Sequence, residues 1–263
     1  MEQVHPVAAA GFSAAADAYE RARPSYPAEA VEWLARRVDL RAGRTVVDVG
    51  AGTGKLTRLL VPTGAHVVAV EPLPAMLARL VEAAPGAEAI LGTAEQLPLP
   101  DASADVITVA QAMHWFDQSR ALPEFRRVLR PRGAVALVWN SRDLEDPLQA
   151  GLGRVLEPAR RRVPAQLDDA WREPFERSPL FGPFDEFRLP FAQLFTVEDL
   201  CDRVSSTSFV AAMPSEDRAE LLESVRALVD GVPEPFPFRY VTEIFVAPAA
   251  DEAAAGHGAR HRR

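Results

Sequence analysis

The stretch VVDVGAGTGKLT, residues 46–57, decides the fold of this chain. It begins as a short apolar run typical of a buried strand, passes through three glycines at alternate positions and then takes up a helical pattern. Glycine permits positive φ and lets a ligand approach the backbone closely. In a doubly wound sheet this turn lies at the carboxyl edge of the strands, where ligands bind. The stretch therefore predicts a strand–loop–helix unit with a ligand-binding loop. A tight turn that binds nothing is the alternative.

Apolar runs and helical patterns alternate on both sides of this stretch, which is typical of βαβ units and a parallel sheet. Parallel strands are buried on both faces, so continuous apolar runs are expected in them. We predict five such strands, at residues 45–49, 66–70, 89–91, 105–109 and 134–139. Helices are expected between them at residues 55–61, 74–84 and 119–129.

The flanking segments complete the predicted organisation. Two helices are expected before the core, at residues 12–21 and 27–38, and two strands after it, at residues 184–195 and 238–246. Thr196 and Ser215, each followed by acidic residues, are typical of helix N-termini. The predicted parts are N-terminal helices covering the site (1–43), a core (44–246) with an insertion at about 143–182, and a disordered tail (247–263).

Composition limits the possible partners and compartments. Lys and Arg number 29 against 37 Asp and Glu, so the net charge is −8 and nothing supplies the basic surplus on which nucleic-acid affinity rests. The lone cysteine, Cys201, excludes an intramolecular disulfide and fits a reducing compartment. No apolar run approaches the ~18–20 residues that span a bilayer. We expect a cytoplasmic protein without nucleic-acid or membrane partners, and arginine in place of nearly all lysine indicates a GC-rich, bacterial genome.

Three ligand classes compete for the glycine-rich loop. A Walker phosphate loop fails, because Val49 occupies the first glycine position and Leu56 follows Lys55. A dinucleotide fingerprint is weakened, because Gly54 comes one residue early for Gly-x-Gly-x-x-Gly. A nicotinamide dinucleotide nevertheless stays open on the residues alone. No His/Asp/Glu cluster has the spacing of metal ligands, so no metal is expected.

The remaining pattern, Asp48-x-Gly50-x-Gly52-x-Gly54, resembles motif I of the class I S-adenosylmethionine-dependent methyltransferases. The resemblance runs from about residue 12 to residue 246. It implies an α/β, Rossmann-like, doubly wound, seven-stranded and mostly parallel sheet, whose last long strand is antiparallel. It also implies an N-terminal helical lid and an insertion after strand five, both covering the site. The implied cofactor is S-adenosyl-L-methionine.

The same resemblance implies which residues contact the cofactor. Glu71 would accept the ribose hydroxyls, Leu73 and Met76 would flank the adenine, Glu95 would address its edge, and Gln111 would lie near the methionine part. The full implied set is Tyr19, Asp48, Gly50, Ala51, Gly52, Gly54, Glu71, Pro72, Met76, Ala94, Glu95 and Gln111.

His114 is the best candidate for a catalytic base, because it directly follows a core strand and an ordinary imidazole pKa of about 6.5 suits proton transfer. The alternative is a packed imidazole that bonds to backbone. His114-Trp115-Phe116 and the Tyr-x-x-x-Arg-Pro-x-Tyr-Pro stretch at residues 19–27 resemble the trans-aconitate-methyltransferase-like branch. That branch implies a small-molecule acceptor with a hydroxyl or carboxyl oxygen.

If the acceptor is a carboxylate, it needs no base, and His114 would instead orient it as a hydrogen-bond donor. Arg142 or Arg160–Arg162 could then be the partners of the carboxylate. The favoured interpretation of an arginine run, however, is a solvated helix face. We predict methyl transfer from S-adenosylmethionine to a small molecule by a monomer or homodimer. The alternatives are a nicotinamide-dependent oxidoreductase and a non-enzymatic S-adenosylmethionine-binding module.

Overall fold

The computed structural model describes residues 23–160 and 171–250 of the 263-residue chain. The helix expected at residues 12–21 therefore lies outside the described residues. The structure contains a seven-stranded sheet with the order β3-β2-β1-β4-β5-β7-β6. Its strands are β1 (Thr45–Val49), β2 (His66–Glu71), β3 (Glu88–Leu91), β4 (Ala104–Ala110), β5 (Leu129–Arg142), β6 (Asp185–Phe195) and β7 (Phe236–Pro248).

Helical elements connect these strands. They are α3 (Ala28–Arg37), α4 (Thr57–Leu60), the 3-10 turn η1 (Val61–Thr63), α5 (Pro74–Ala83), the 3-10 turn η2 (Met113–Trp115), α6 (Gln118–Val128), α7 (Pro147–Arg160), α8 (Arg172–Glu176), α9 (Val197–Ser205), α10 (Ser208–Ala211) and α11 (Ser215–Leu228). The helix expected at residues 55–61 is therefore shorter than predicted, and α10 was not predicted.

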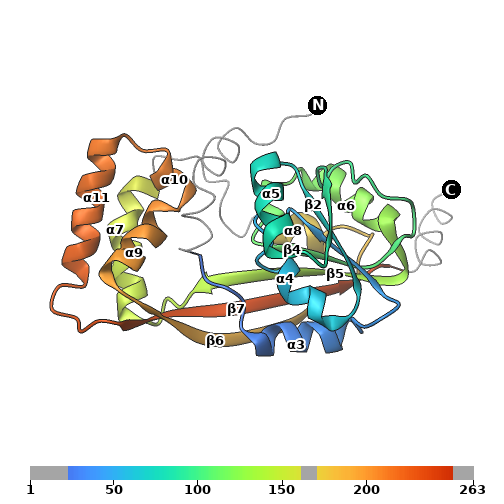
Figure 1. Ribbon diagram of the computed structural model, residues 1–263, viewed down its shortest axis with the longest axis horizontal. Coiled ribbons are helices and arrows are strands. Elements are labelled where there is room, and N and C mark those ends of the chain that lie inside the picture. Colours follow the sequence, from blue (N-terminus) through green and yellow to red (C-terminus); the bar gives the residue numbers. More distant parts are fainter. Residues whose placement is uncertain (1–22, 161–170, 251–263) are drawn as a thin grey trace, which may run out of the picture. The chain divides into compact units, whose positions relative to one another are not determined.

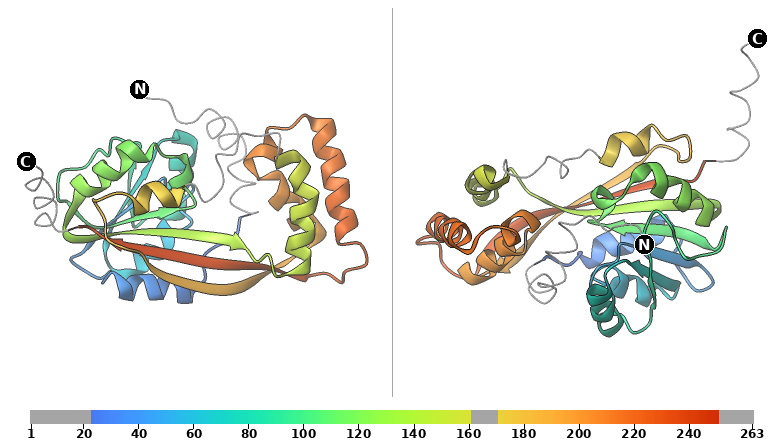
Figure 2. Two further views of the ribbon diagram at one scale, coloured as in Figure 1. Left: turned by 180° about the vertical axis from the view of Figure 1, so that it is seen from behind. Right: turned by 90° about the horizontal axis from the view of Figure 1, so that it is seen from above.

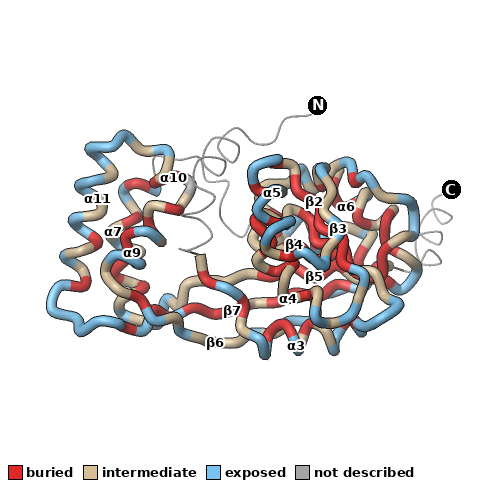
Figure 3. Tube along the Cα trace, viewed as in Figure 1, coloured by how far each residue is buried: buried red, intermediate tan, exposed pale blue. Residues whose placement is uncertain are grey.

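The first five strands confirm the predicted parallel arrangement. β1 pairs in parallel with β2 and with β4, β2 pairs with β3, and β4 pairs with β5. The central strands are buried along most of their length (Figure 3), as expected for strands covered on both faces. β7 runs against β5, because Ala249 N donates to Gly133 O at one end and Asp143 N donates to Arg239 O at the other. The sheet is therefore mixed and Rossmann-like.

The start of β5 differs from the prediction. The strand begins at Leu129, not Ala134, because Leu129 already pairs with Ala104. The register then shifts between Ala104 and Val106. Pro131 lies within the strand beside this irregularity, where a residue without a backbone N–H is tolerated, so it does not delay the start of the strand.

The described residues fall into two compact units. Of the described residues, unit 1 comprises 23–27, 139–160 and 188–243, and unit 2 comprises 28–138, 171–187 and 244–250. In unit 2, helices α3, α4 and α5 cover one face of the strands, while α6 and α8 cover the other (Figures 1 and 2). The domain boundaries expected from the sequence stay a prediction.

The segment at residues 143–182 contributes to both units. In unit 2, Trp171 packs edge-on against Phe245 with ring centroids 5.3 Å apart, and the guanidinium of Arg172 lies 5.2 Å from the centre of the Phe245 ring. In unit 1, α7 joins α9, α10, α11 and β7 around a core that includes Leu152, Val204 and Tyr240. The two ends of the segment are thus held by separate sets of apolar contacts.

Of the two helix N-caps predicted after β6, Thr196 is confirmed and Ser215 is not. Thr196 forms a capping box with Asp199, whose carboxylate accepts the Thr196 backbone N–H at 2.8 Å, which confirms the predicted start of α9. Ser215 does not cap α11, because Pro214 occupies the N-cap position without a side-chain hydrogen bond. The serine expected as a cap lies inside the first turn.

Candidate active site

The loops that follow β1, β2, β3 and β4 meet at the carboxyl edge of the sheet in unit 2. Gly50 N and Ala51 N both donate to Val70 O, at 2.9 and 3.2 Å, and join the first loop to the second strand. The Asp117 backbone N–H donates to the Glu95 carboxylate at 2.9 Å, which joins the loop after β3 to the segment after β4. These bonds join the β1 loop to β2, and the β3 loop to the segment after β4.

The glycine loop has the backbone conformation that the sequence predicted. Gly50, Gly52 and Gly54 have φ of +66°, +59° and +85°, a region that side chains with a Cβ rarely adopt. Gly50 also has a neighbour from another loop, because a Cβ built there would lie 2.9 Å from Ala112 Cβ and 3.0 Å from Phe116 Cζ. The segment after β4 thus packs directly on the glycine loop.

Asp48 lies beneath this loop and is fully buried. Thr57 Oγ1 donates to one carboxylate oxygen at 2.6 Å, and Thr108 Oγ1 donates to the other at 2.9 Å. Burial raises the pKa of Asp48 to about 6, and the two hydroxyl groups oppose that rise. The carboxylate therefore ties the β1 loop to α4 and to β4. Contact of Asp48 with the cofactor stays a prediction.

Glu71 ends β2, and its side chain is 4% exposed. Gly52 N donates to one carboxylate oxygen at 2.9 Å, and Leu73 N donates to the other at 3.0 Å. Burial raises the pKa of Glu71 to about 7, the two backbone N–H groups oppose that rise, and the nearby Asp48 charge adds a small further increase. A carboxyl group that titrates near neutrality is thus fixed against the glycine loop.

An ion-pair clamp positions the loop after β3. Arg127 Nη2 donates to Leu97 O at 3.1 Å and to Glu124 at 2.7 Å, while Glu124 accepts the Leu97 backbone N–H at 3.0 Å. Arg127 Nη1 also donates to Leu99 O at 2.8 Å. Leu97 and Leu99 are therefore both hydrogen-bonded to side chains of α6. These bonds restrain the loop that carries Ala94 and Glu95.

The segment after β4 carries the candidate base. Gln111 has φ of +57°, an uncommon conformation for a residue other than glycine, and its backbone N–H donates to Val138 O at 3.0 Å. His114 is half-buried in η2, with its ring centroid 4.7 Å from that of Trp115. Strained backbone of this kind gathers at functional sites.

The structure brings most of the predicted site residues to this one edge. Tyr19 lies outside the described residues. Sequence reasoning missed Thr57 and Thr108 as partners of Asp48, and Asp117 as a partner of Glu95. Only Thr57 could have been suspected, since it stands in the same loop-to-helix stretch. Thr108 is 60 residues away in the chain, and no sequence pattern links it to Asp48.

The residues present fit S-adenosylmethionine. A Cβ at Gly52 would meet only Met76 Sδ at 3.9 Å, so the glycine keeps space open beside the side chain expected at the adenine. Glu71, at the edge of this space, offers the carboxylate oxygens that accept hydrogen bonds from vicinal hydroxyls. Within residues 23–160 and 171–250, no group of three or more His, Cys, Asp or Glu could hold a metal ion. In the same ranges, no helix is long and apolar enough to cross a bilayer.

Comparisons with known proteins agree with this site. The family model "Methyltransferase domain" matches residues 47–137, which include the β1, β2, β3 and β4 loops. An uncharacterized methyltransferase of Mycobacterium tuberculosis is 43% identical over 222 residues, covering 83% of this chain and 85% of that protein. A malonyl-[acyl-carrier protein] O-methyltransferase of Serratia marcescens is 34% identical over 129 residues, covering 46% of this chain and 51% of that protein.

A solved structure supports the same assignment. It is described as "Putative Type II Methyltransferase" from Anaeromyxobacter dehalogenans, is 27% identical, covers 86% of this chain and 97% of that chain, and gives a TM-score of 0.67. The similarity thus extends over the fold as well as over the matched loops. Together with the 43% identity to the mycobacterial protein, it shows that this chain belongs to the S-adenosylmethionine-dependent methyltransferases.

Proposed function

We propose that this methyltransferase moves the methyl group of S-adenosylmethionine to a hydroxyl or carboxyl oxygen of a small molecule, as the trans-aconitate-methyltransferase-like branch does. The observation that carries the proposal is the packing of the His114-bearing segment on the glycine loop through Ala112 and Phe116. The Serratia relative, whose name is that of an O-methyltransferase, supports an oxygen acceptor.

The chain's main contribution is alignment. The bound cofactor supplies a methyl group already activated on a positively charged sulfur. Glu71 would hold the ribose hydroxyls, and Gly52, where a Cβ would meet only Met76 Sδ at 3.9 Å, would let the backbone of the loop lie against the cofactor. Holding two reactants in a reactive geometry supplies roughly 7–11 kcal/mol. His114 would accept the proton of a hydroxyl acceptor, whereas a carboxylate acceptor has no proton to lose.

Several finer features stay proposals of the same kind. The N-terminal helices and the segment at residues 143–182 would cover the site, and the protein would act as a monomer or homodimer. The proposed location is the cytoplasm, and the single free cysteine, Cys201, supports a reducing compartment. Membership of the methyltransferase family favours this function over the nicotinamide-dependent alternative. A turnover assay would distinguish an enzyme from a module that binds S-adenosylmethionine without transferring its methyl group.

The test is release of S-adenosylhomocysteine during incubation with hydroxyl, carboxyl and amine compounds. We expect turnover with oxygen acceptors and at least a tenfold loss in Glu71→Ala, because the ribose loses its carboxylate. The matched control is Glu82→Ala on the exposed face of α5. Turnover on amines alone would overturn the oxygen acceptor, and cofactor binding with no turnover on any compound would favour the binding module.

A further inference from the structure

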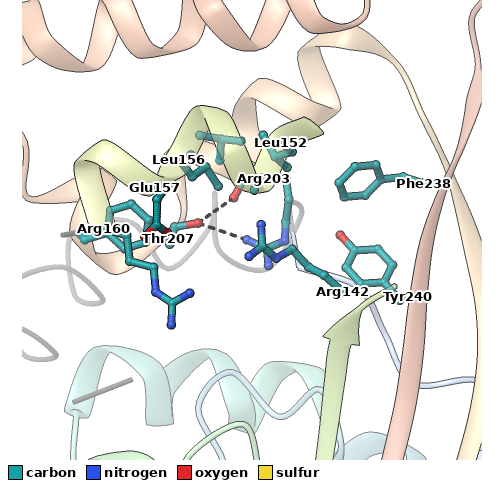
Figure 4. A pocket seen from close by; sticks show the side chains of 12 residues that line it. Arg142, Leu152, Leu156, Glu157, Arg160, Arg203, Thr207, Phe238 and Tyr240 are labelled. Carbon is teal, nitrogen blue, oxygen red and sulfur yellow. Dashed lines mark hydrogen bonds between the residues drawn. The ribbon is translucent and has the colours of Figure 1, made fainter. Parts of the chain in front are cut away.

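A cavity of about 270 Å³ lies inside unit 1, among α7, α9 and the strands β5 and β7 (Figure 4). Its volume is near the lower end of the range for small-molecule sites. Its lining is of two kinds. One part is apolar, from Leu152, Leu156, Val204, Phe209 and Phe238, and the other carries Arg142, Glu157, Arg160, Arg203, Thr207 and Tyr240.

Three donors at this cavity are buried and have no hydrogen-bond partner within the part of the chain that the structure describes. They are Arg142 Nη1, Arg203 Nε and the Tyr240 hydroxyl. Tyr240 is 1% exposed, so bulk solvent does not compensate its hydroxyl. A buried polar group without a partner costs about 1–3 kcal/mol. Buried unpaired donors are rare in native proteins, and three around one cavity call for a ligand that accepts hydrogen bonds.

The three donors converge. Figure 4 shows the guanidinium groups of Arg142 and Arg203 close together, with the Tyr240 hydroxyl pointing toward them. Arg203 is restrained by a 3.3 Å hydrogen bond from its Nη1 to Thr207 Oγ1, one turn further along the chain. The Tyr240 ring is held between Phe191, stacked at 5.5 Å, and Phe238, edge-on at 5.3 Å. Two of the three donors, those of Arg203 and Tyr240, therefore belong to side chains held in place by their neighbours.

The charge of the lining is positive. Among the described residues that line the cavity, Arg142, Arg160 and Arg203 stand against one carboxylate, that of Glu157. Burial lowers the pKa of the Arg142 guanidinium, and the positive charges of Arg203 and Arg160 lower it further. Two guanidinium groups brought together in a partly desolvated cavity repel each other, and an anion between them would remove that cost.

We propose that this cavity binds a small organic oxyanion, whose oxygens accept hydrogen bonds from Arg142, Arg203 and Tyr240. The apolar body of the ligand packs against the leucine and phenylalanine side chains of the lining. Carboxylate and phosphate share the necessary chemistry, since both present several oxygens to a guanidinium fork. The proposal does not depend on methyl transfer, because every group it uses lies in unit 1.

The test is calorimetric titration of the full chain, without S-adenosylmethionine, using three ligands with the same ring. Benzoate and phenyl phosphate supply the two oxyanions, and benzamide is the neutral counterpart of benzoate. We expect saturable binding of at least one oxyanion, at least tenfold tighter than that of benzamide. The tighter of the two oxyanions identifies the preferred group. Equal binding of benzoate and benzamide, or no saturable binding of either oxyanion, would overturn the proposal.

Four variants connect the binding to the cavity. Arg142→Gln and Arg203→Gln should weaken oxyanion binding at least tenfold, and Tyr240→Phe should weaken it severalfold while keeping the ring contacts. Arg154→Gln on the exposed side of α7 removes the same charge outside the lining and should leave binding within twofold. A thermal melt confirms that each variant is folded. Equal weakening by Arg154→Gln would show diffuse attraction to a basic surface and refute the site.

The outcome is independent of the methyltransferase assay. Binding measured without cofactor can succeed even where no acceptor in the panel is methylated. Failure of the oxyanion titration, in turn, leaves the cofactor site in unit 2 and its turnover untouched.

Discussion

Glu71 illustrates how one buried side chain can make cofactor affinity depend on pH. Its carboxylate must be ionised to accept hydroxyl donors, yet burial raises its pKa to about 7. We expect the Kd for S-adenosylmethionine to rise as pH falls below about 7, approaching tenfold per pH unit, because each binding event must then release a proton.

Calorimetry between pH 5.5 and 8.5 measures this dependence. Glu71→Gln should bind more weakly at pH 8 and show a flat profile, whereas the exposed Glu82→Gln should keep the profile of the native protein. A sloping profile in Glu71→Gln would assign the titration to another group.

His114 supports a second prediction at the scale of the residue. His114→Ala should lower turnover on a hydroxyl acceptor by about 10²–10⁴-fold, the usual contribution of a positioned base. Affinity for S-adenosylmethionine should stay within twofold. Turnover on a carboxylate acceptor should fall much less, because that oxygen carries no proton.

His66→Ala is the control, since the His66 side chain is 59% exposed at the start of β2 and pairs with Glu88. Single-turnover rates on a matched alcohol and carboxylate separate the two roles. Unchanged turnover on the alcohol would remove His114 from the mechanism.

At the scale of the element, alanine substitutions in the glycine loop and at Gly43, which lies outside it, can distinguish the cost of positive φ from the cost of a steric clash. Gly43, Gly50 and Gly52 all have positive φ, but only Gly50 has close neighbours, while Gly43 has nothing within 4 Å. A substitution to alanine should cost each position about 1–2 kcal/mol of backbone strain. Gly50→Ala should cost more, because its methyl group collides with Ala112 and Phe116.

Chemical denaturation and cofactor titration together check this comparison. Gly52→Ala should resemble Gly43→Ala in stability but lose cofactor affinity at least tenfold, whereas Gly43→Ala should bind normally. Normal binding by Gly52→Ala would mean that the cofactor lies elsewhere.

The N-terminus of α9 gives a further prediction for a single element. Thr196→Ala removes the hydroxyl that accepts the Asp199 backbone N–H at 3.1 Å, and should cost about 0.5–2 kcal/mol of unfolding free energy. Ser215→Ala in the first turn of α11 should change stability by less than about 0.5 kcal/mol, because Ser215 is not the cap. Urea denaturation monitored by circular dichroism measures both, and equal losses would contradict the assignment of the caps.

At the scale of the whole molecule, the buried carboxyls Asp48 and Glu71 make stability depend on pH. Their pKa values in the folded protein, about 6 and about 7, lie above their ordinary values of 3.8 and 4.5. A raised pKa means that the folded state holds the proton more tightly. Its stabilising contribution is therefore complete below about pH 4 and is lost as pH rises through 6 and 7.

Glutamine does not titrate, so we expect the unfolding free energy of the native protein minus that of Glu71→Gln to fall as the pH rises from 4.5 to 7.5. Denaturant titrations of both proteins across this range measure the difference, which cancels the contribution of all other groups. A rise of this signed difference with pH would contradict the raised pKa.

The sheet could be predicted because its signals are local. Each buried parallel strand is a continuous apolar run, and Thr45–Val49 and Ala104–Ala110 were found within a residue of their bounds. The start of β5 was misplaced, because the pairing of Leu129 with Ala104 depends on a strand 25 residues earlier. The glycine loop could be recognised in the sequence, because positions with positive φ favour glycine.

What the sequence determined by itself is the order of strands and helices, the glycine-rich loop and the carboxylate that ends β2, since each follows from neighbouring residues and the periodicity of the backbone. Only the tertiary structure decided that Thr57 and Thr108 share Asp48, and that Arg142, Arg203 and Tyr240 surround one cavity. Apart from Thr57, which is nine residues from Asp48, those groups lie tens of residues apart, and their contact depends on which faces pack together. That choice is made by burial of the whole core, and no short stretch of sequence records it.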